Sequence, residues 1–600
     1  MSLNKKPDFT DEIFERKPYL RLYFSRKLFG NTELASAPDG SGYFLKTDGR
    51  AMASAVSPLK QAERTASEAF SDNSLVILLG LGNPHTAEIL NSRLEPGRTF
   101  LIIERNYDAV SALWDISLKN ILEVPGRHIF AGEEAEILLW NYLESLSAEK
   151  LDSVKFFRNQ SDILYYKDFY RETEEKINRV FSSKMSDLLT KFEFERIWVR
   201  NTLINTIHFH SSSVKRTRIR SLENRFAGST AVLVSAGPSL RSQCSLLKKY
   251  RDRLFIFSCD TSMKVLQKFG IMPDGVMTLD AQNHSFFHFL GEDFSKIPLF
   301  ADLVTSPRLI RSFNFLSVVH SATAKYRIDA EGNAVRETTA GTELSEKFIG
   351  PAGDLQSGGS VATSAFDALR FMGFSQVFLA GQDLAYTGRE IHSTGTHHNE
   401  RWLTLVSRKN SLEKINEAVV RKRNTKYVES AQGGTVLTDY VLNLYRHWFE
   451  ESAKSVNFPV YNISGAGARI MNMENISLED AEKKIQELQS HGYYWKNFSP
   501  WQKGGRETSS SEAEEAVRSE IAELLEELNE WKNQDYGEIE KEWNILKKEK
   551  KHISSLFRKT EIYIFRHSSV LNDEKKKELF LEAAEKELRL LKRAVIGALG

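Results

Sequence analysis

The stretch "STAVLVSAGPSLRSQCSLLKKY", residues 229–250, decides the fold that is predicted for the centre of this chain. A short apolar run, residues 231–234, ends in Ala-Gly-Pro-Ser, and a helical pattern follows at once. Apolar strands and helices continue to alternate as far as residue 383. Such alternation is typical of parallel β-α-β crossovers, so it predicts an α/β fold with a doubly wound, mostly parallel, Rossmann-like sheet.

The length predicts several domains, because 600 residues exceed what one hydrophobic core holds. We expect an N-terminal α/β domain at residues 1–219, a central domain at 220–475 and a helical domain at 476–600. In the helical domain, apolar residues recur at steps of four and three, which predicts a packed seam. Copies of the chain could self-associate through the helices of this domain. The seam residues are Val517, Ile521, Leu524, Leu528, Trp531, Ile539, Trp543 and Leu546.

Three segments are expected to lie outside the long helices and the main sheets. Residues 19–30, "YLRLYFSRKLFG", read as short strands and turns. Residues 325–358 are polar and rich in glycine, which favours a lid or a mobile loop over a core element. Residues 507–516, "ETSSSEAEEA", read as a solvated joint before the helical domain.

The composition excludes several classes of function. Lys and Arg (81) balance Asp and Glu (80), so a net charge of +1 provides no field that would concentrate nucleic acid or an anionic membrane. Cys244 and Cys259 are the only cysteines, which excludes a disulfide framework and suits a reducing cytoplasm. No apolar run approaches the roughly 20 residues of a membrane span, so we expect a cytoplasmic protein without an integral membrane segment.

Small turn residues or carboxylates follow each predicted strand of the central domain. In an open parallel sheet, ligands bind outside the carboxyl ends of the strands. We therefore expect a ligand site at this edge, and the alternative is ordinary turn and cap usage. The strand-end residues are Gly237, Pro238 and Ser239, then Asp260, then Asp280 and Gln282, then Asp302, and finally Gln382 and Asp383.

Two of the turns open helices and suit an anionic ligand. Gly237 permits a close approach or a positive φ, Pro238 suits helix entry, and Ser239 can cap a helix whose first N–H groups bind phosphate. Residues 358–360, Gly-Gly-Ser, open a second amphipathic helix. Two such starts at one sheet edge predict a nucleotide-linked ligand held at both ends, and the alternative for each is a bare helix cap.

These motifs carry a resemblance to a known family. "SAGPSL" (235–240), "MPDGVMTLDAQ" (272–282) and above all "GGSVATSAFDALRFMGFSQVFLAGQDLAYTGREIH" (358–392) resemble the central domain of the motility accessory factor (Maf) proteins. "GGTVLTDYVLNLYRHWFE" (433–450) and "VYNISGAGARI" (460–470) continue the match. The same domain also resembles bacterial sialyltransferases and archaeal hydroxymethylpterin diphosphokinases.

The resemblance implies a glycosyltransferase that supports flagellar assembly and motility. It would move a nonulosonic, sialic-acid-like sugar from a CMP-activated donor to Ser or Thr hydroxyls of flagellin. By matched position, the nucleotide-binding residues would be Gly237, Pro238, Ser239, Leu240, Asp260, Asp280, Gln282, Gly358, Gly359, Ser360 and Gln382. Asp383 and Tyr386 match the last strand end. His392 matches the family histidine and is predicted to be the general base.

This chemistry is expected to need no cofactor and no metal. A CMP donor carries one phosphate, whose developing charge helix N–H groups can stabilise, and the chain has no Asp-x-Asp triplet. Histidine is the default base near neutral pH, and Asp383 could orient His392 and raise its pKa. The corresponding base of the sialyltransferases lies further downstream, so His397 and His398 are alternates. Zinc bound by the three histidines is a further alternative, although no cysteine lies nearby.

Two other functions stay open. One is a Mg²⁺-dependent, pterin-type diphosphokinase that would use the strand-end aspartates, although no Gly-x-x-x-x-Gly-Lys-Ser/Thr loop is present. The other is a non-catalytic chaperone that binds flagellin and keeps a decayed site.

The N-terminal segment "LVILLGLGNPHTAEIL" predicts another strand, glycine turn and helix. Gly80 and Gly82 lie in this turn, and Glu104 at the next strand end has the spacing of an acidic ribose contact. His85 takes the place of the third glycine of the dinucleotide fingerprint. The turn therefore belongs either to a nucleotide or methyl-donor site or to a purely structural Rossmann-like module, and the second is favoured.

Overall fold

The computed structural model describes residues 7, 9–26, 30–133, 135–147, 149, 151–209, 215–291, 293–328, 334–339, 341–463, 465–489, 510–568 and 570–596. Packing divides the chain into two compact units. Unit 1 comprises Met1–Glu193, Ile328–Gly332 and Lys559–Asn572, and unit 2 comprises Phe194–Arg327, Asn333–Arg558 and Asp573–Gly600. The domain boundaries expected at residues 219 and 475 stay predictions.

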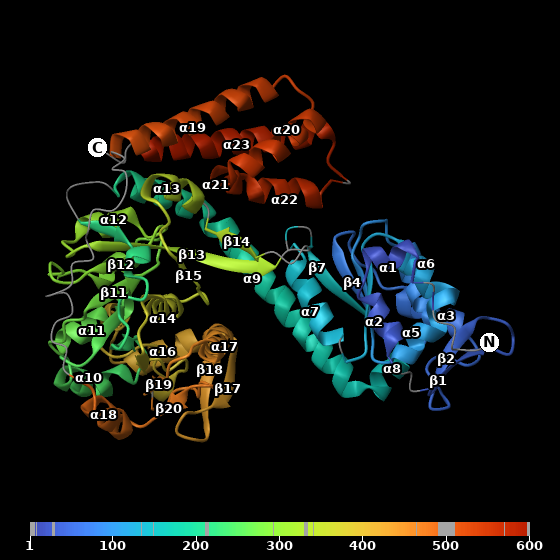
Figure 1. Ribbon diagram of the computed structural model, residues 1–600, viewed down its shortest axis with the longest axis horizontal. Coiled ribbons are helices and arrows are strands. Elements are labelled where there is room, and N and C mark those ends of the chain that lie inside the picture. The colour runs from blue at the N-terminus through green and yellow to red at the C-terminus, as the bar shows by residue number, and fades with distance from the viewer. Residues whose placement is uncertain are drawn as a thin grey trace. The chain divides into compact units, whose positions relative to one another are not determined.

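Unit 1 is an α/β unit, as predicted. Its parallel sheet has the strand order β6-β5-β4-β7, and an antiparallel sheet has the order β1-β2-β3 (Figure 1). The strands are β1 (Thr32–Ser36), β2 (Tyr43–Thr47), β3 (Arg50–Ala51), β4 (Ser74–Leu79), β5 (Phe100–Glu104), β6 (Arg127–Ala131) and β7 (Ser153–Arg158). The helices are α1 (Glu12–Arg16), α2 (Leu20–Ser25), α3 (Pro58–Ala66), α4 (Pro84–Ser92), α5 (Tyr107–Leu113), α6 (Lys119–Glu123), α7 (Ala135–Ser145) and α8 (Gln160–Tyr165), with the first part of α9 (Lys167–Ile207) and most of α22 (Arg558–Arg566).

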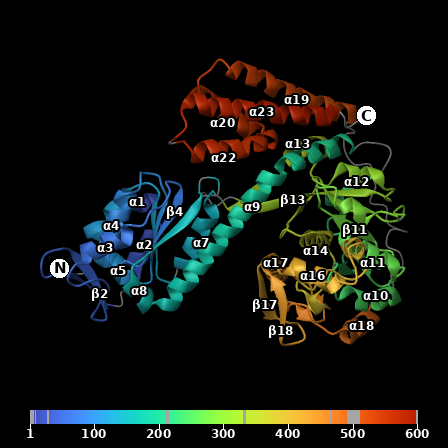
Figure 2. The ribbon, with the colours of Figure 1, turned by 180° about the vertical axis from the view of Figure 1, so that it is seen from behind.

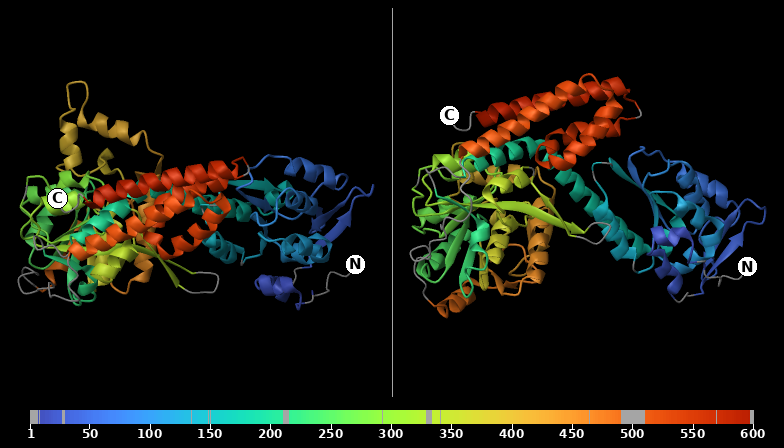
Figure 3. Two further views of the ribbon diagram at one scale, coloured as in Figure 1. Left: turned by 90° about the horizontal axis from the view of Figure 1, so that it is seen from above. Right: turned by 45° about the horizontal axis from the view of Figure 1, so that its top comes forward.

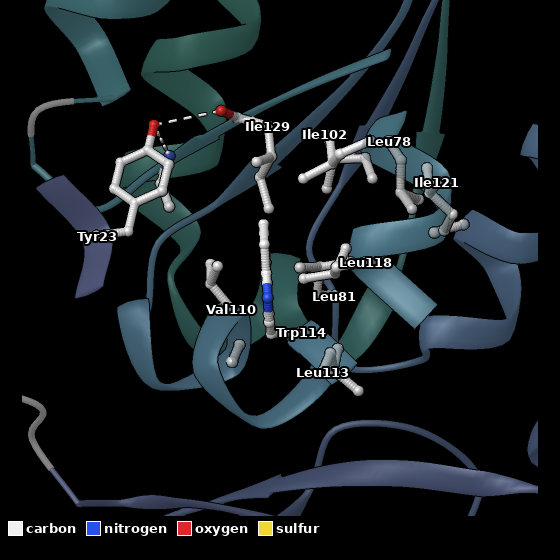
Figure 4. Close-up of a cluster of buried hydrophobic side chains, with 14 of the residues drawn as sticks. Tyr23, Leu78, Leu81, Ile102, Val110, Leu113, Trp114, Leu118, Ile121 and Ile129 are labelled. Carbon is white, nitrogen blue, oxygen red and sulfur yellow. Dashed lines mark hydrogen bonds between the residues drawn. The ribbon is translucent and has the colours of Figure 1, made fainter. Parts of the chain in front are cut away.

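The prediction of short strands at residues 19–30 is wrong, because α2 lies there. Leu20, Tyr23 and Phe24 are buried, and their spacing of three and four residues places them on one helical face. Figure 4 shows Tyr23, whose hydroxyl donates to the carbonyl of Ile129 at 3.2 Å, beside the cluster around Trp114. Leu81, from the N-terminal glycine turn, belongs to the same core and is fully buried.

Unit 2 is built on the predicted central sheet, which has 11 strands in the described part of the chain. Its main path runs β14-β13-β12-β11-β10-β9-β16-β19-β20, and the pairs from β12 to β19 are parallel, which confirms the doubly wound fold. The strands are β8 (Arg216–Arg218), β9 (Thr230–Val234), β10 (Phe255–Cys259), β11 (Gly275–Thr278), β12 (Leu299–Asp302), β13 (Val318–Ile328), β14 (Ala334–Thr338), β15 (Asp354–Leu355), β16 (Gln376–Ala380), β19 (Val460–Asn462) and β20 (Glu474–Asn475), besides the hairpin β17 (Thr425–Glu429) and β18 (Thr435–Asp439).

Helices cover both faces of this sheet, as near-continuous apolar strands require. Ala231 and Leu233 of β9 face a core with α14 and α17, whereas Val232 and Val234 face a core with α10, α11 and α18 (Figures 1 and 2). The helices of unit 2 before the C-terminal bundle are α10 (Leu240–Lys249), α11 (Met263–Lys268), α12 (Pro307–Ser312), α13 (Thr342–Ile349), α14 (Val361–Met372), α15 (His397–Leu403), α16 (Leu412–Val420), α17 (Tyr440–Ser455) and α18 (Leu478–Gln486), joined by the end of α9.

The segment expected to be a lid is instead part of the folded sheet where the structure describes it. Residues 325–358 contribute the end of β13, then β14, α13 and β15. Arg336 of β14 forms ion pairs with Glu346 and Asp354, and Leu344 and Leu355 are buried. Residues 329–333 and 340 lie outside the described residues. The polar composition therefore reflects an ion-pair network and not a free loop.

The C-terminal region is helical, as predicted. It contains α19 (Ser510–Trp531), α20 (Tyr536–Glu549), α21 (Lys551–Ser554) and α23 (Asp573–Ile596), and α19 runs beside α23 (the orange and red helices of Figure 3). All eight predicted seam residues are buried. Residues 510–516 of the expected joint begin α19, and 507–509 lie outside the described residues. In the described part of the chain, no helix is long and apolar enough to cross a membrane.

Candidate active site

The central sheet reverses its strand order between β9 and β16. The chain builds outward from β9 through β10, β11, β12 and β13, and returns to the other side of β9 with β16 and β19. Ser235, just after β9, donates its N–H to the carbonyl of Ala380 at the end of β16 at 2.8 Å. Ligands of open α/β sheets bind at such a switch point, so the loops after β9 and β16 define the candidate active site.

The Gly-Pro-Ser turn after β9 packs directly on the Gly-Gln-Asp turn after β16. The N–H of Gly237 donates to the carbonyl of Gly381 at 2.8 Å. A Cβ at Gly237 would lie 2.1 Å from Asp383 Oδ2 and 2.4 Å from the Gly381 oxygen. Only glycine permits this approach, which brings together two turns that are far apart in the sequence.

A carboxylate of the protein already lies at the N-terminus of α10. Ser239 donates its N–H and its hydroxyl to Asp383 Oδ2 at 3.0 and 2.9 Å, and Thr387 donates to Oδ1 at 3.2 Å. Burial raises the pKa of Asp383 to about 6, and the hydrogen bonds from Ser239 act in the opposite direction. The prediction that Ser239 caps the helix with its side chain is wrong, because its hydroxyl binds Asp383. Asp383 is not hydrogen-bonded to His392, so its predicted orienting role is not met in this geometry.

The second predicted helix start, Gly-Gly-Ser before α14, is a true capping box. The Ser360 hydroxyl accepts from the N–H of Thr363 at 3.3 Å. Gly359 has a φ of +93°, and a Cβ at Gly358 would lie 2.4 Å from the Trp448 ring. The paired glycines thus have local causes besides a ligand. Because α14 leads into β16, its N-terminus lies at the same sheet edge as that of α10, on the opposite face.

The predicted strand-end aspartates have hydrogen-bond partners within the protein. Asp260 accepts from the Thr278 hydroxyl at 2.7 Å, and Asp302 accepts from the Thr323 hydroxyl at 2.8 Å. Both are buried, and burial raises each pKa to about 6. Asp280 is only half-buried and accepts from the N–H of Gln282 at 2.8 Å. Asp280, with the half-buried Gln282, is therefore the aspartate that a ligand could reach most readily.

Three further predicted residues have structural partners. Gln382 is buried and accepts a hydrogen bond from Ser235, and Leu240 is fully buried at the start of α10. Tyr386 is buried and donates to Asp439. These buried residues therefore support the two turns from the interior of the protein. Pro238, in contrast, is half-buried beside Gly237 on the accessible side of the turn.

The three predicted histidines gather with a fourth one, and we call these four the imidazole cluster: His288, His392, His397 and His398. The ring centroid of His398 lies 5.3 Å from that of His392 and 5.4 Å from that of His288. The centroids of His288 and His397 are 5.9 Å apart. His392, His397 and His398 follow β16, whereas His288 ends the 3₁₀ turn after β11. Loops from two strands thus build one cluster.

The imidazole cluster adjoins the Gly-Pro-Ser turn. Ser393 donates its N–H to the carbonyl of Ala236, directly before Gly237, at 2.8 Å. Asn399 holds the loop by donating to the carbonyls of His392 and Ser393, both at 2.9 Å. Three buried polar atoms here have no hydrogen-bond partner among the described residues: His288 Nδ1, Ser393 Oγ and Asn399 Oδ1. Buried polar atoms without partners are uncommon, and they suit a water or a polar ligand.

The environment of the imidazole cluster disfavours its charged forms. Burial lowers the pKa of His392 to about 4, and His398 and Arg423 add to the effect. Burial and the three other rings lower the pKa of His288 to about 3. Burial also lowers the pKa of His397, where Glu400 acts in the opposite direction, and of His398. The environment thus favours the neutral form of these rings, which is the form a general base needs. The prediction that Asp383 raises the pKa of His392 is wrong, because burial lowers it.

The sequence reasoning missed His288. Its signal is the run "QNHSFFHF" after β11, which continues beyond the strand-end Asp280. Phe287 in this run stacks on His397 at 5.3 Å between ring centroids. Within the described residues, no group of three or more His, Cys, Asp or Glu side chains is arranged to hold a metal ion.

Two carboxylates from elsewhere in unit 1 bind the N–H groups of the N-terminal glycine turn. Leu81 donates its N–H to Glu104 at 2.7 Å, and Gly82 donates its N–H to Asp162 at 3.1 Å. A Cβ at Gly80 would lie 2.4 Å from the Asp162 Cβ. His85 binds Glu88 and accepts from the N–H of Tyr43. The glycines and Glu104 thus serve internal packing, which favours the structural module.

Comparisons with known proteins agree with the resemblance seen in the sequence. Residues 204–389 match the family model "6-hydroxymethylpterin diphosphokinase MptE-like". A solved structure titled "Structure of MAf glycosyltransferase from Magnetospirillum magneticum AMB-1" is similar with a TM-score of 0.52 and 15% identity, covering 98% of this chain and 95% of that chain. At this identity the likeness concerns the fold, and it confirms that the fold resembles that of a Maf protein.

Curated relatives carry no functional name. Two uncharacterized proteins of Treponema pallidum (strain Nichols) match with 30% identity over 125 residues and 28% identity over 149 residues. The matched segments cover 20% and 25% of this chain. They span 57% of the first relative and 25% of the second, which is less than two thirds of either protein.

Proposed function

We propose that this chain is a glycosyltransferase that moves a nonulosonic sugar from a CMP-activated donor to Ser or Thr hydroxyls of flagellin in the cytoplasm. The observation that carries the proposal is the meeting of the Gly-Pro-Ser turn, the Gly-Gln-Asp turn and the imidazole cluster at one switch point. A half-buried anion-binding turn beside neutral imidazoles matches the needs of a phosphate-leaving, hydroxyl-accepting reaction. The likeness in fold to a Maf glycosyltransferase agrees with it.

In this proposal the donor lies across the sheet edge between Ser239 and Ser360. These residues precede helices on opposite faces, so the nucleotide bridges the two layers. The phosphate takes the N–H and the hydroxyl of Ser239 and displaces the Asp383 carboxylate, whose raised pKa allows it to become protonated when an anion approaches. Asp383 therefore occupies the anion position until the donor binds.

The transfer step needs one proton acceptor. The bond between the anomeric carbon and the phosphate oxygen breaks, and its electron pair leaves with CMP. The acceptor oxygen bonds to the anomeric carbon and gives its proton to an imidazole, for which His392 is proposed, with His397 and His398 as alternates. A positioned base of this kind contributes about 10²–10⁴ in rate. The unpartnered atoms of His288, Ser393 and Asn399 are available for sugar or acceptor hydroxyls.

A diphosphokinase is the second candidate, because the matched family model names that activity. It would need Asp280 and its neighbours to bind Mg²⁺ together with a nucleoside triphosphate. Asp260 and Asp302 are engaged with Thr278 and Thr323, so they would have to leave these partners first. A non-catalytic chaperone that binds flagellin is the third candidate.

A ligand panel separates these candidates. Thermal shifts of the full chain are measured with CMP, with ATP and Mg²⁺, and with S-adenosylmethionine. The proposal expects stabilisation by CMP, loss of this effect in Ser239→Ala, and sugar transfer that survives EDTA. Stabilisation by ATP only with Mg²⁺, without any by CMP, would favour the diphosphokinase. Binding of flagellin without any nucleotide response would favour the chaperone.

A further inference from the structure

A pocket lies at the same edge of the central sheet, beside the loops that follow β11 and β12. It has a volume of about 490 Å³ and is lined by Arg200, Asn283, Ser306, Arg308 and Arg311, among others. Arg200 comes from α9, and Arg308 and Arg311 come from α12. In the sheet, β11 is separated from β9 by β10, so the pocket is distinct from the Gly-Pro-Ser turn.

Helix α9, which carries Arg200, is hydrogen-bonded to the loops at the sheet edge. The side-chain amide of Asn201 donates to the carbonyls of Ala281 and Val304, both at 2.9 Å. Asn205, one turn later on α9, makes another pair of such bonds to the loop after β12. The loops after β11 and β12 are thereby clamped to the helix. A rigid support of this kind pre-organises the side chains that it carries.

Neutral groups hold two of the three guanidinium groups. Arg200 donates to Asn201 Oδ1 at 2.8 Å, and Arg308 lies over the ring of Phe286 at 5.0 Å from its centroid. Neither has a carboxylate within ion-pair distance among the described residues, and burial lowers the pKa of Arg200. Their positive charges are thus positioned without being neutralised.

A fourth arginine, Arg216 of β8, lies close to Arg311. Arg311 is near enough to Arg216 of β8 to contribute to lowering its pKa to about 10, although burial is the main cause. A guanidinium group binds carboxylate and phosphate through paired N–H groups, so an oxyanion is the ligand that fits this arrangement.

We propose that this pocket binds an oxyanion, a carboxylate or a phosphate, at a point separate from the nucleotide turn. The inference stands apart from the proposed function, because the carboxylate and the phosphate of a CMP-activated nonulosonic acid are bonded to the same anomeric carbon and one such donor cannot place them in two sites that are two strands apart. The polar groups of Asn283 and Ser306 complete the lining.

The test uses the full chain and two simple probes, inorganic phosphate and N-acetylneuraminate, in isothermal titration at low ionic strength. Arg200→Gln and Arg308→Gln are compared with the wild type and with Arg421→Gln, which removes the same charge from an exposed ion pair with Glu417. We expect at least one probe to bind, its affinity to fall about tenfold or more in both pocket variants, and the control to keep wild-type affinity. Preference for one probe identifies a carboxylate or a phosphate site.

CMP binding by the same variants completes the test. The proposal expects unchanged CMP affinity in Arg200→Gln and Arg308→Gln, because the nucleotide turn is elsewhere. It is overturned if neither probe binds the wild type, if the pocket variants bind both probes normally, or if CMP affinity falls together with probe affinity. Absence of CMP binding to the wild type would contradict the proposed function alone, since the response to the anion probes is measured independently.

Discussion

The chain contains two strand-glycine-helix turns that look alike in sequence and differ in exposure. In unit 1, the turn after β4 is buried along Leu81–Thr86, and Glu104 and Asp162 take its N–H groups. In unit 2, the turn after β9 is half-buried along Gly237–Ser239, and Asp383 alone takes the N–H of Ser239. The first turn is closed by its own core, whereas we propose that the second exchanges its carboxylate for a ligand.

This difference in exposure shows that a glycine turn after a parallel strand does not by itself indicate a nucleotide site. Gly82 and Gly237 are both required because a Cβ would collide with a carboxylate of the protein. What distinguishes the central turn is its partial exposure and the imidazole cluster beside it. Function therefore follows from the surroundings of the turn, and the motif alone is common to both.

The largest expected effect is a loss of stability when a side chain is added at the closed turn of unit 1. A Cβ at Gly82 would lie 2.4 Å from the Met52 Cβ and 2.5 Å from Asp162 Oδ2. Gly82→Ala should lower the free energy of unfolding of unit 1 by about 3 kcal/mol through overpacking. The measurement is urea-dependent hydrogen exchange of the β4–α4 peptide. Gly40→Ala is the control, since nothing lies within 4 Å of its Cβ and the positive φ costs about 1 kcal/mol. Equal stability of the two variants would contradict this packing.

The next effect concerns the imidazole cluster beside the open turn. His392→Ala should lower the rate of sugar transfer about 10²-fold and leave CMP affinity nearly unchanged, because the base acts on the acceptor hydroxyl. His397→Ala and His398→Ala are measured in parallel under saturating donor. A normal rate in His392→Ala with a large loss in either neighbour would move the base assignment. Normal rates in all three would remove the imidazoles from the mechanism.

A further effect concerns Glu104, one of the two buried carboxylates at the closed turn of unit 1. Burial raises the pKa of Glu104 from 4.5 to about 7, so the folded state binds a proton more readily than the unfolded state. Its contribution to stability is therefore present below pH 4.5 and is lost as the pH rises towards 7. Glu104→Gln should lack this dependence. The difference in urea midpoint between wild type and Glu104→Gln is measured from pH 4.5 to pH 8, and a difference that stays constant would contradict the assignment.

The smallest effect sharpens the contrast between the two serines at the central edge. Ser360→Ala removes the N-cap of α14 and should lower stability by about 1 kcal/mol. Ser239→Ala removes no cap, so it should change stability less and CMP affinity more. Calorimetric unfolding and CMP titration of both variants provide the comparison. The same loss of stability in Ser239→Ala as in Ser360→Ala would show that Ser239 has a mainly structural role.

The sequence was sufficient for the architecture where periodicity is strong. The strands around Gly237, the helix from Val361 and the C-terminal seam all follow from apolar patterns that local geometry enforces. It failed at residues 19–30, because the helical spacing of Leu20, Tyr23 and Phe24 was read as strands and turns. It also failed for the described residues of 325–358, because the ion pairs of Arg336 hold this polar segment against the fold.

The candidate site could be located from the sequence but not assembled from it. Strand ends fix which loops share an edge, and this placed Gly237 and Asp383 together. The sequence could not show that Asp383 binds Ser239 and not His392, because side-chain pairing between distant loops depends on packing. His288 was missed for the same reason. In the N-terminal turn, the N–H of Gly82 binds Asp162, which lies 80 residues away in the sequence, so no local pattern could indicate this pairing.

Hydrogen–deuterium exchange of the full chain with and without CMP tests the central claim most directly, because one experiment reports on both turns. The account predicts that CMP slows exchange in peptides covering residues 235–243 and 358–364, while exchange in residues 79–86 stays unchanged. Exchange at 235–243 that does not respond to saturating CMP, or protection confined to 79–86, would contradict the claim that the central turn is the open one.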